Sequence, residues 1–120
     1  MRRFNPNPCC IIASDCVVRA ICAATGRDWY SVYWELCEQG AAMCDMPSVN
    51  RVWSAYLTGL GCRRYDIARA CSIREFARDQ PRGVYILGTG THAVAVIDGN
   101  YYDAWDSGNE QPLYYFVLEA

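Results

Sequence analysis

Three side chains have the types and the chain order of a thiol-based catalytic site. Cys16 lies at the expected start of a helix, His92 at the start of an expected strand, and Asp106 on the next strand. A thiolate can attack a carbonyl carbon, an imidazole can share and relay the proton, and a carboxylate can hold the imidazole in place. The sequence therefore predicts Cys16 as nucleophile, His92 as general base and acid, and Asp106 as the orienting group.

The position of Cys16 favours its thiolate. The N-terminus of a helix stabilises an anion, so the pKa of a thiol placed there can fall. Asp15 precedes Cys16 and opposes this effect unless its carboxylate caps the helix. The leading backbone N–H groups of the same helix, including that of Cys16, can donate to an oxyanion.

Apolar residues at helical spacing predict four helices in the first two-thirds of the chain. N-cap residue types, glycine stops and a Ser-x-x-Glu capping box mark their ends. The expected helices run from about 16 to 25, from about 29 to 39 with Gly40 as the stop, from Pro47 and Ser48 to Gly59, and from Ser72 to before Pro81.

The last third of the chain is rich in β-branched and aromatic residues, which predicts strands. The expected strands are 84–87, 93–97, 101–105 and 113–118, with a further short one at 63–67. Helices followed by strands indicate an α+β domain. We therefore expect residues 1–120 to form one domain, with N-terminal helices packed on a C-terminal antiparallel sheet.

The hairpin after His92 decides which aspartate faces the imidazole. If Asp98, Gly99 and Asn100 form a three-residue loop, His92 lies opposite Asp106, with Cβ atoms about 4.5–5.5 Å apart. If only Asp98 and Gly99 form the loop, Asp103 lies on the face of His92 instead. We take Asp106 as the first choice and Asp103 as the alternative.

Composition narrows the function classes. The net charge of −2 argues against a nucleic-acid partner, and no apolar run approaches the roughly 20 residues of a membrane span. The chain has eight cysteines and one histidine, without a C-x-x-C pair or an export signal. We therefore expect reduced thiols in the cytoplasm, no metal site and no cofactor.

Three segments resemble papain-like cysteine peptidases. Residues 14–21 (SDCVVRAI) look like their nucleophile helix, and residues 90–97 (GTHAVAVI) look like their histidine strand. Residues 102–107 (YDAWDS) are similar to the strand with the third residue in the bacteriocin-leader peptidase branch. The same segments also resemble small uncharacterised proteins encoded by phages and mobile elements of gut bacteria.

The resemblance implies a papain-like fold and a thiol protease-type activity. Papain-like enzymes usually carry a Gln or Asn a few residues before the nucleophile as an oxyanion donor. Residues 10–15 read Cys-Ile-Ile-Ala-Ser-Asp here, so Asn5, Asn7 or Ser14 is left for that role.

The function expected from these observations is a thiol-dependent hydrolase in the cytoplasm of a bacterial host cell. Its substrate would be a peptide or protein, cleaved at a peptide, isopeptide or amide bond. Two alternatives stay open. One is an acyl transferase with the same three residues. The other is a non-enzymatic binding protein of a phage or mobile element that inhibits a host system.

Overall fold

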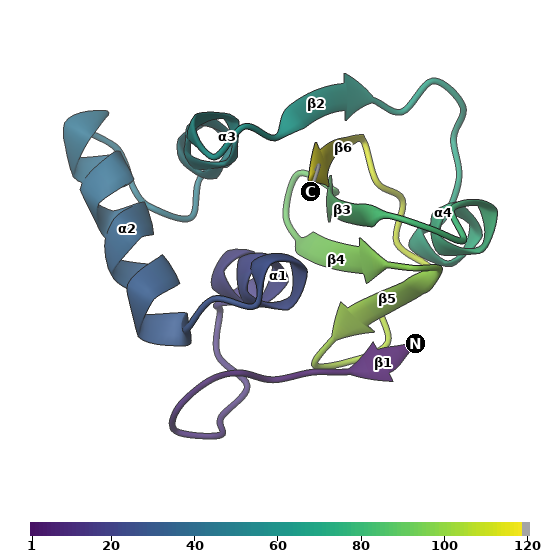
Figure 1. Ribbon diagram of the computed structural model, residues 1–120, viewed down its shortest axis with the longest axis horizontal. Coiled ribbons are helices and arrows are strands. Elements are labelled where there is room, and N and C mark those ends of the chain that lie inside the picture. Colours follow the sequence, from purple (N-terminus) through teal and green to yellow (C-terminus); the bar gives the residue numbers. More distant parts are fainter. Residues whose placement is uncertain (119–120) are drawn as a thin grey trace.

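The structure is a computed structural model that describes residues 1–118. These residues form an α+β domain (Figure 1). Its helices are α1 (Cys16–Thr25), α2 (Trp29–Ala42), α3 (Asn50–Gly59) and α4 (Ile73–Asp79). Its strands are β1 (Arg2–Arg3), β2 (Arg63–Asp66), β3 (Val84–Gly88), β4 (Ala93–Ile97), β5 (Asn100–Asp103) and β6 (Tyr114–Leu118).

The sheet is mixed. Its strand order is β1-β5-β4-β3-β6-β2, and β1 runs parallel to β5 while the other neighbours are antiparallel. The expectation of an antiparallel sheet is therefore wrong at one edge, where β1, which the sequence analysis did not predict, pairs in parallel with β5. At the other edge, the antiparallel β2 is the short strand expected at 63–67. A two-residue strand such as β1 is too short for hydrophobic alternation to reveal it.

Helices cover both faces of the sheet. Figure 1 shows α1 between the sheet and α2, with α4 at the other side. Ala93 and Ala95 of β4 pack in the core that includes α1, whereas Val94 and Val96 pack with α4. This alternation is the period of a strand. The small alanine side chains let α1 approach β4 closely, which brings the N-terminus of α1 near the start of β4.

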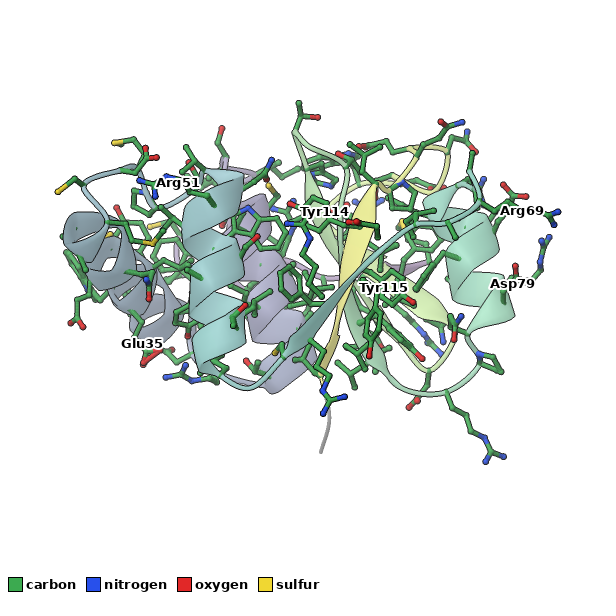
Figure 2. All side chains as sticks on the ribbon, turned by 90° about the horizontal axis from the view of Figure 1, so that it is seen from above. Glu35, Arg51, Arg69, Asp79, Tyr114 and Tyr115 are labelled. Carbon is green, nitrogen blue, oxygen red and sulfur yellow. The ribbon has the colours of Figure 1, made fainter. Side chains whose placement is uncertain are left out.

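The same alternation is visible on β6. Tyr114 belongs to the core beside α1 and α3, and Tyr115 packs against the core beside α4. Figure 2, which looks along the sheet from above, shows the two rings on either side of the strand. The sheet is thus the middle layer of the domain.

The observed ends of α1 and α2 can be compared with the ends predicted from the glycine stops. Helix α1 spans 16–25 as predicted, and Gly26 follows it in the left-handed region with φ of 73°. The expected stop at Gly40 is wrong, because α2 continues to Ala42. A Cβ atom on Gly40 would lie 2.7 Å from the carbonyl oxygen of Asp45, so this glycine serves a close backbone approach.

The later helices give one correction and one confirmation. Helix α3 begins at Asn50 rather than at Pro47 and Ser48. The capping box at α4 is confirmed: the Ser72 hydroxyl accepts from the Glu75 N–H, and the Glu75 carboxylate accepts from the Ser72 N–H.

Candidate active site

Cys16 is the first residue of α1 and is half-buried. It lines three surface hollows, and His92 lines two of them, of about 280 and about 470 Å³. The turn before β4 positions His92, because the Thr89 N–H donates to the His92 carbonyl at 2.9 Å and Gly90 adopts a φ of 97°. The structure therefore brings Cys16 and His92 together at one open site.

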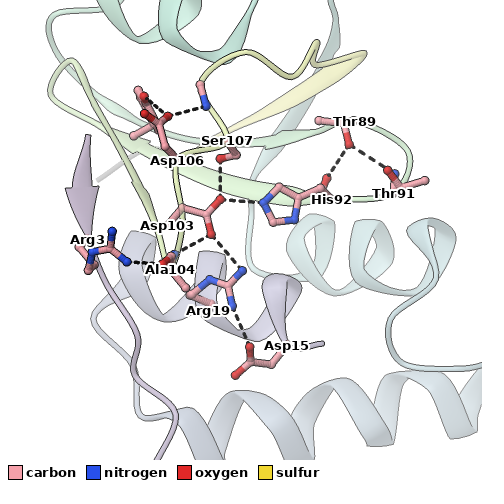
Figure 3. A network of polar contacts seen from close by, with 12 residues as sticks. Arg3, Asp15, Arg19, Thr89, Thr91, His92, Asp103, Ala104, Asp106 and Ser107 are labelled. Carbon is pink, nitrogen blue, oxygen red and sulfur yellow. Dashed lines mark hydrogen bonds and ion pairs between the residues drawn. The ribbon is translucent and has the colours of Figure 1, made fainter. Parts of the chain in front are cut away.

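Asp103, at the end of β5, holds the imidazole. Its Oδ2 atom lies 2.7 Å from Nε2 of His92, and the Ser107 hydroxyl donates to the same oxygen at 2.6 Å (Figure 3). Its Oδ1 atom accepts from the Ala104 N–H at 2.7 Å. Asp103 is 0% exposed. Since Nε2 is taken by the carboxylate, Nδ1 is the ring nitrogen left for the thiol.

The expectation that Asp106 faces His92 is wrong. The hairpin has a two-residue loop: Ile97 pairs with Asn100, and Asp98 and Gly99 have φ of 48° and 84°. Positive φ at both central residues is typical of a type I′ turn. In this register the alternative, Asp103, reaches His92.

Asp106 has partners of its own at the surface. It accepts from the Tyr101 hydroxyl at 2.6 Å and from the Gly108 N–H at 3.0 Å, and its carboxylate lies 3.4 Å from Arg74. These contacts are separate from the imidazole of His92.

Arg19 joins two carboxylates behind the site, a role that the sequence analysis missed. Its guanidinium lies 2.8 Å from Asp15 and 3.0 Å from Asp103, and the residue is 1% exposed (Figure 3). The one local signal is the i,i+4 spacing of Asp15 and Arg19. The guanidinium offsets the charge of Asp103, so the buried carboxylate can stay ionised beside the imidazole.

Asp15 does not cap α1 with its side chain, which answers the question that the sequence left open. It occupies the N-cap position but makes no capping hydrogen bond with its side chain. Its carboxylate instead accepts from Arg19, from the Trp29 indole N–H at 3.0 Å and from the Asn7 amide at 3.3 Å. The leading N–H groups of α1 therefore lack this side-chain acceptor and remain for an anion.

Asn5 and Asn7 brace the loop before α1. Asn7 donates to Asp15 and accepts from the Cys9 N–H, while Asn5 donates to the carbonyl of Ile11. Neither lines the two hollows that contain both Cys16 and His92, whereas Ser14 lines the larger one. Of the three oxyanion candidates, Ser14 is the one beside the thiol.

The charges at the site favour a thiolate and an imidazolium. Burial alone would raise the pKa of Cys16, but hydrogen bonding to His92 and to the Ala93 backbone, with the charges of His92 and Arg19, lowers it below its ordinary value. Burial would lower the pKa of His92, but hydrogen bonds to Asp103 and Cys16 raise it to about 9. The two shifts describe one coupled ion pair.

The pKa of the third group, Asp103, is also shifted. Burial would raise its pKa, but the hydrogen bonds from His92 and Ser107 and the charge of His92 outweigh burial and lower it. Trp105 stacks on the imidazole, with ring centroids 4.9 Å apart, and the guanidinium of Arg19 also lies over the Trp105 ring. The indole thus shields the His92 side of the network from water.

Three other cysteines have raised thiol pKa values, in contrast to Cys16. All eight cysteines of the chain are free thiols. Burial is the main cause that raises the pKa of Cys22 to about 11 and that raises the pKa values of Cys62 and Cys71. Among the described residues, no three His, Cys, Asp or Glu side chains are grouped to hold a metal ion.

No helix within residues 1–118 is long and apolar enough to cross a membrane. The comparisons with known proteins found no match to the chain among family models, curated proteins or solved structures.

Proposed function

We propose that this protein is a thiol-dependent hydrolase with a papain-like arrangement of Cys16, His92 and Asp103. It would cleave a peptide, isopeptide or amide bond. The observation that carries the proposal is the position of His92, which contacts the buried Asp103 carboxylate and shifts the pKa of Cys16 downward. A nucleophile beside a base that a third group orients is the recurring pattern of covalent catalysis.

Each step has a group placed for it. The Cys16 thiolate attacks the carbonyl carbon of the substrate and forms a tetrahedral oxyanion. His92, protonated at rest, gives its proton to the leaving amine as the C–N bond breaks, and a thioester remains on Cys16. Water then loses a proton to His92, attacks the thioester and releases the acid, and the thiol with its imidazole returns to the starting ion pair.

The N-terminus of α1 can stabilise the oxyanion. The backbone N–H of Cys16 stands at the reacting sulfur, and the Asp15 side chain makes no capping bond to this helix. Fixed N–H donors aimed at a developing charge are among the largest contributions to acyl-transfer catalysis. The Ser14 hydroxyl lines the same hollow and is the side chain we assign as the second donor.

The buried network favours catalysis over a binding protein that keeps only the fold. Arg19, His92 and Asp103 are 1%, 9% and 0% exposed. Apolar side chains of similar size often stabilise a fold as well as a buried ion pair does, or better. Burying these charged groups costs desolvation free energy, and the network orients the imidazole beside a thiol that lines surface hollows. A catalytic role of that thiol explains why such a network is present.

Brief alkylation tests the proposal without knowledge of the substrate. Iodoacetamide at about pH 6 should label Cys16 ahead of the seven other thiols, because its thiolate persists well below the ordinary pKa of about 8.5. His92→Ala should move this reactivity towards about pH 8–9. Cys9 and Cys10, which are exposed, are the internal controls, and mass spectrometry gives the labelled positions.

An activated ester then tests acylation. With p-nitrophenyl acetate the wild type should release nitrophenol in a burst, followed by slower turnover, and Cys16→Ala should show neither. Label spread over several cysteines at about pH 6, or a burst that survives Cys16→Ala, would overturn the proposal and favour the binding-protein alternative.

A further inference from the structure

The larger hollow at the thiol is lined by one acidic residue that the proposed mechanism does not use. Cys16, His92, Trp105 and Glu110 line this hollow, whose volume is about 470 Å³. The smaller hollow shared by Cys16 and His92, of about 280 Å³, is lined by no acidic or basic side chain other than His92 and the thiol. Glu110 therefore gives the two hollows different charges.

The position of Glu110 is fixed by the loop that also holds Asp103. The Glu110 N–H donates to the Ser107 carbonyl at 3.0 Å, and the Glu110 carbonyl accepts from the Ile73 N–H at 2.9 Å. Ser107 in turn donates its hydroxyl to Asp103. The backbone of Glu110 is thus tied to the loop that holds the orienting carboxylate of Asp103 and to the start of α4.

The charge of Glu110 is not neutralised by the residues described. Among residues 1–118, no arginine or histidine forms an ion pair with Glu110. Arg19 pairs instead with Asp15 and Asp103, and Arg74 pairs with Asp106. In the proposed resting state, the opposite charges of the thiolate and the imidazolium offset one another. Glu110 is half-buried, so its charge is screened less than that of a fully exposed side chain.

The direction of the reaction places the leaving amine here. His92 must reach the departing nitrogen to protonate it, so the part of the substrate after the cleaved bond lies on the His92 side of the thiol. Of the two hollows on that side, the one with Glu110 has the greater volume and suits a long side chain.

We propose, on the basis of the proposed hydrolase function, that Glu110 is a specificity residue for substrates with a positive charge directly after the cleaved bond. An arginine or lysine residue at that position fits the chemistry of the hollow. Its cation would pair with Glu110 while its methylene groups pack against Trp105, which is 39% exposed.

A peptide library tests this inference. Peptides made by cleavage after glutamate, which keep internal arginine and lysine, are incubated with the wild type, Cys16→Ala, Glu110→Gln and Glu110→Arg. The charge-matched control is Glu38→Gln, at an exposed residue of α2. Mass spectrometry of new ends gives the residue after each cleaved bond. We expect about a 5- to 10-fold preference for arginine and lysine, the size of one partly solvated ion pair.

The variants separate the inference from the function on which it rests. Glu110→Gln should abolish the preference and Glu110→Arg should turn it towards aspartate, the acidic residue that these peptides keep internally, while Glu38→Gln should keep it. Cleavage that depends on Cys16 but shows no preference, or the same preference in Glu110→Gln, would overturn the inference and leave the hydrolase in place. Absence of any cleavage that depends on Cys16 would overturn both.

Charged thiol reagents give a second readout that needs no turnover. Cationic and anionic methanethiosulfonates of similar size react with Cys16, and the ratio of their rates reports the charge of the hollow. Glu110→Gln should lower the cation-to-anion ratio by about 5-fold, and Glu38→Gln should leave it unchanged. An unchanged ratio in Glu110→Gln would show that the carboxylate does not act at the thiol.

Discussion

Two polar clusters are centred on neighbouring aspartates, one at the end of β5 and one just after it, and they differ in burial. Asp103 is buried with Arg19 and His92, whereas Asp106 is exposed with Arg74. Each aspartate accepts one hydroxyl at 2.6 Å and one backbone N–H, from Ser107 and Ala104 in the first case and from Tyr101 and Gly108 in the second. The two aspartates therefore accept nearly the same set of hydrogen bonds from hydroxyl and backbone donors.

What differs is the consequence of each contact. Water can replace a lost partner of Asp106, but it cannot reach Asp103, so every partner of Asp103 is required. Burial also strengthens the effect of the carboxylate on the imidazole. The comparison shows why the hydrogen-bond pattern of a carboxylate does not by itself identify a catalytic group, and it predicts unequal effects of matched substitutions.

The largest difference is expected for the two arginines. Arg19→Met removes the guanidinium that the buried carboxylates of Asp15 and Asp103 share, which should lower the free energy of unfolding by about 3–5 kcal/mol. Arg74→Met, at the surface, should leave it nearly unchanged. Urea unfolding followed by tryptophan fluorescence measures both.

If Arg19→Met is too unstable to study, the double variant with Asp103→Asn should recover part of the loss, because one buried charge is removed. Equal stability of Arg19→Met and Arg74→Met would contradict the assignment of the inner cluster as a tightly coupled unit.

The two aspartates should differ next in their effect on the thiol. Asp103→Asn removes the charge that raises the pKa of His92, so the rate of Cys16 alkylation at about pH 6 should fall at least about tenfold, the equivalent of one pKa unit. Asp106→Asn should change it by less than about twofold. The reverse order would restore Asp106 as the orienting group.

The titration of His92 sharpens the comparison directly. His92 is the one histidine of the chain, so its ring signals in an NMR titration need no assignment. The midpoint should lie near the pKa of about 9, fall in Asp103→Asn and stay in place in Asp106→Asn. A wild-type midpoint at the ordinary value of about 6.5 would remove the ion pair from the resting site.

The raised pKa of His92 also makes the free energy of unfolding depend on pH. The pKa of His92 is raised from 6.5 to about 9 on folding, so its stabilisation is complete below about pH 6.5 and is lost as the pH rises to about 9. Cys16 acts in the opposite sense, because its lowered pKa stabilises the fold at high pH. In a Cys16→Ala background, Asp103 still raises the pKa of His92, so the stability advantage of His92 over His92→Gln should shrink as the pH rises above about 6.5 in urea unfolding.

The smallest effect is expected for the two hydroxyl donors. Ser107→Ala leaves the buried Asp103 with one fewer donor, which should cost about 1–1.5 kcal/mol. Tyr101→Phe removes a donor from the exposed Asp106, where water substitutes, and should leave stability close to that of the wild type. Differential scanning calorimetry of the pair resolves the order, and a larger loss in Tyr101→Phe would contradict it.

The sequence was sufficient for the elements that carry Cys16 and His92. An apolar stripe between cap residue types and Gly26 defined α1, and β-branched residues after a glycine turn defined β4. The sequence also contained the correct hairpin signal, since Asp-Gly is a typical two-residue type I′ loop. The preference for a three-residue loop shifted the register by one residue and selected Asp106 over Asp103.

Other features depend on contacts that no local pattern reports. Arg19 interrupts an apolar helix face. Only the folded chain shows that its guanidinium forms an ion pair with Asp103, which lies far along the sequence. Gly40 has the residue type of a helix stop, but the approach of Asp45 explains it. Asp15 occupies the N-cap position, but its carboxylate binds Arg19 of the same helix and two partners from outside it, Asn7 and Trp29, in place of the helix N–H groups.

Strand β1 links the site to the kinetics of folding. Arg3 donates to the Ala104 carbonyl across a sequence separation of 101 residues, and the Phe4 N–H donates to the Asp103 carbonyl. Contacts between such distant parts of a chain require large loops to close and slow the folding of a domain. The pairing of Arg2 and Arg3 with β5 therefore belongs to the late stages of folding. Since this pairing flanks Asp103, the docking of β1 would complete the surroundings of the orienting carboxylate, and thiol reactivity would report completion of the fold.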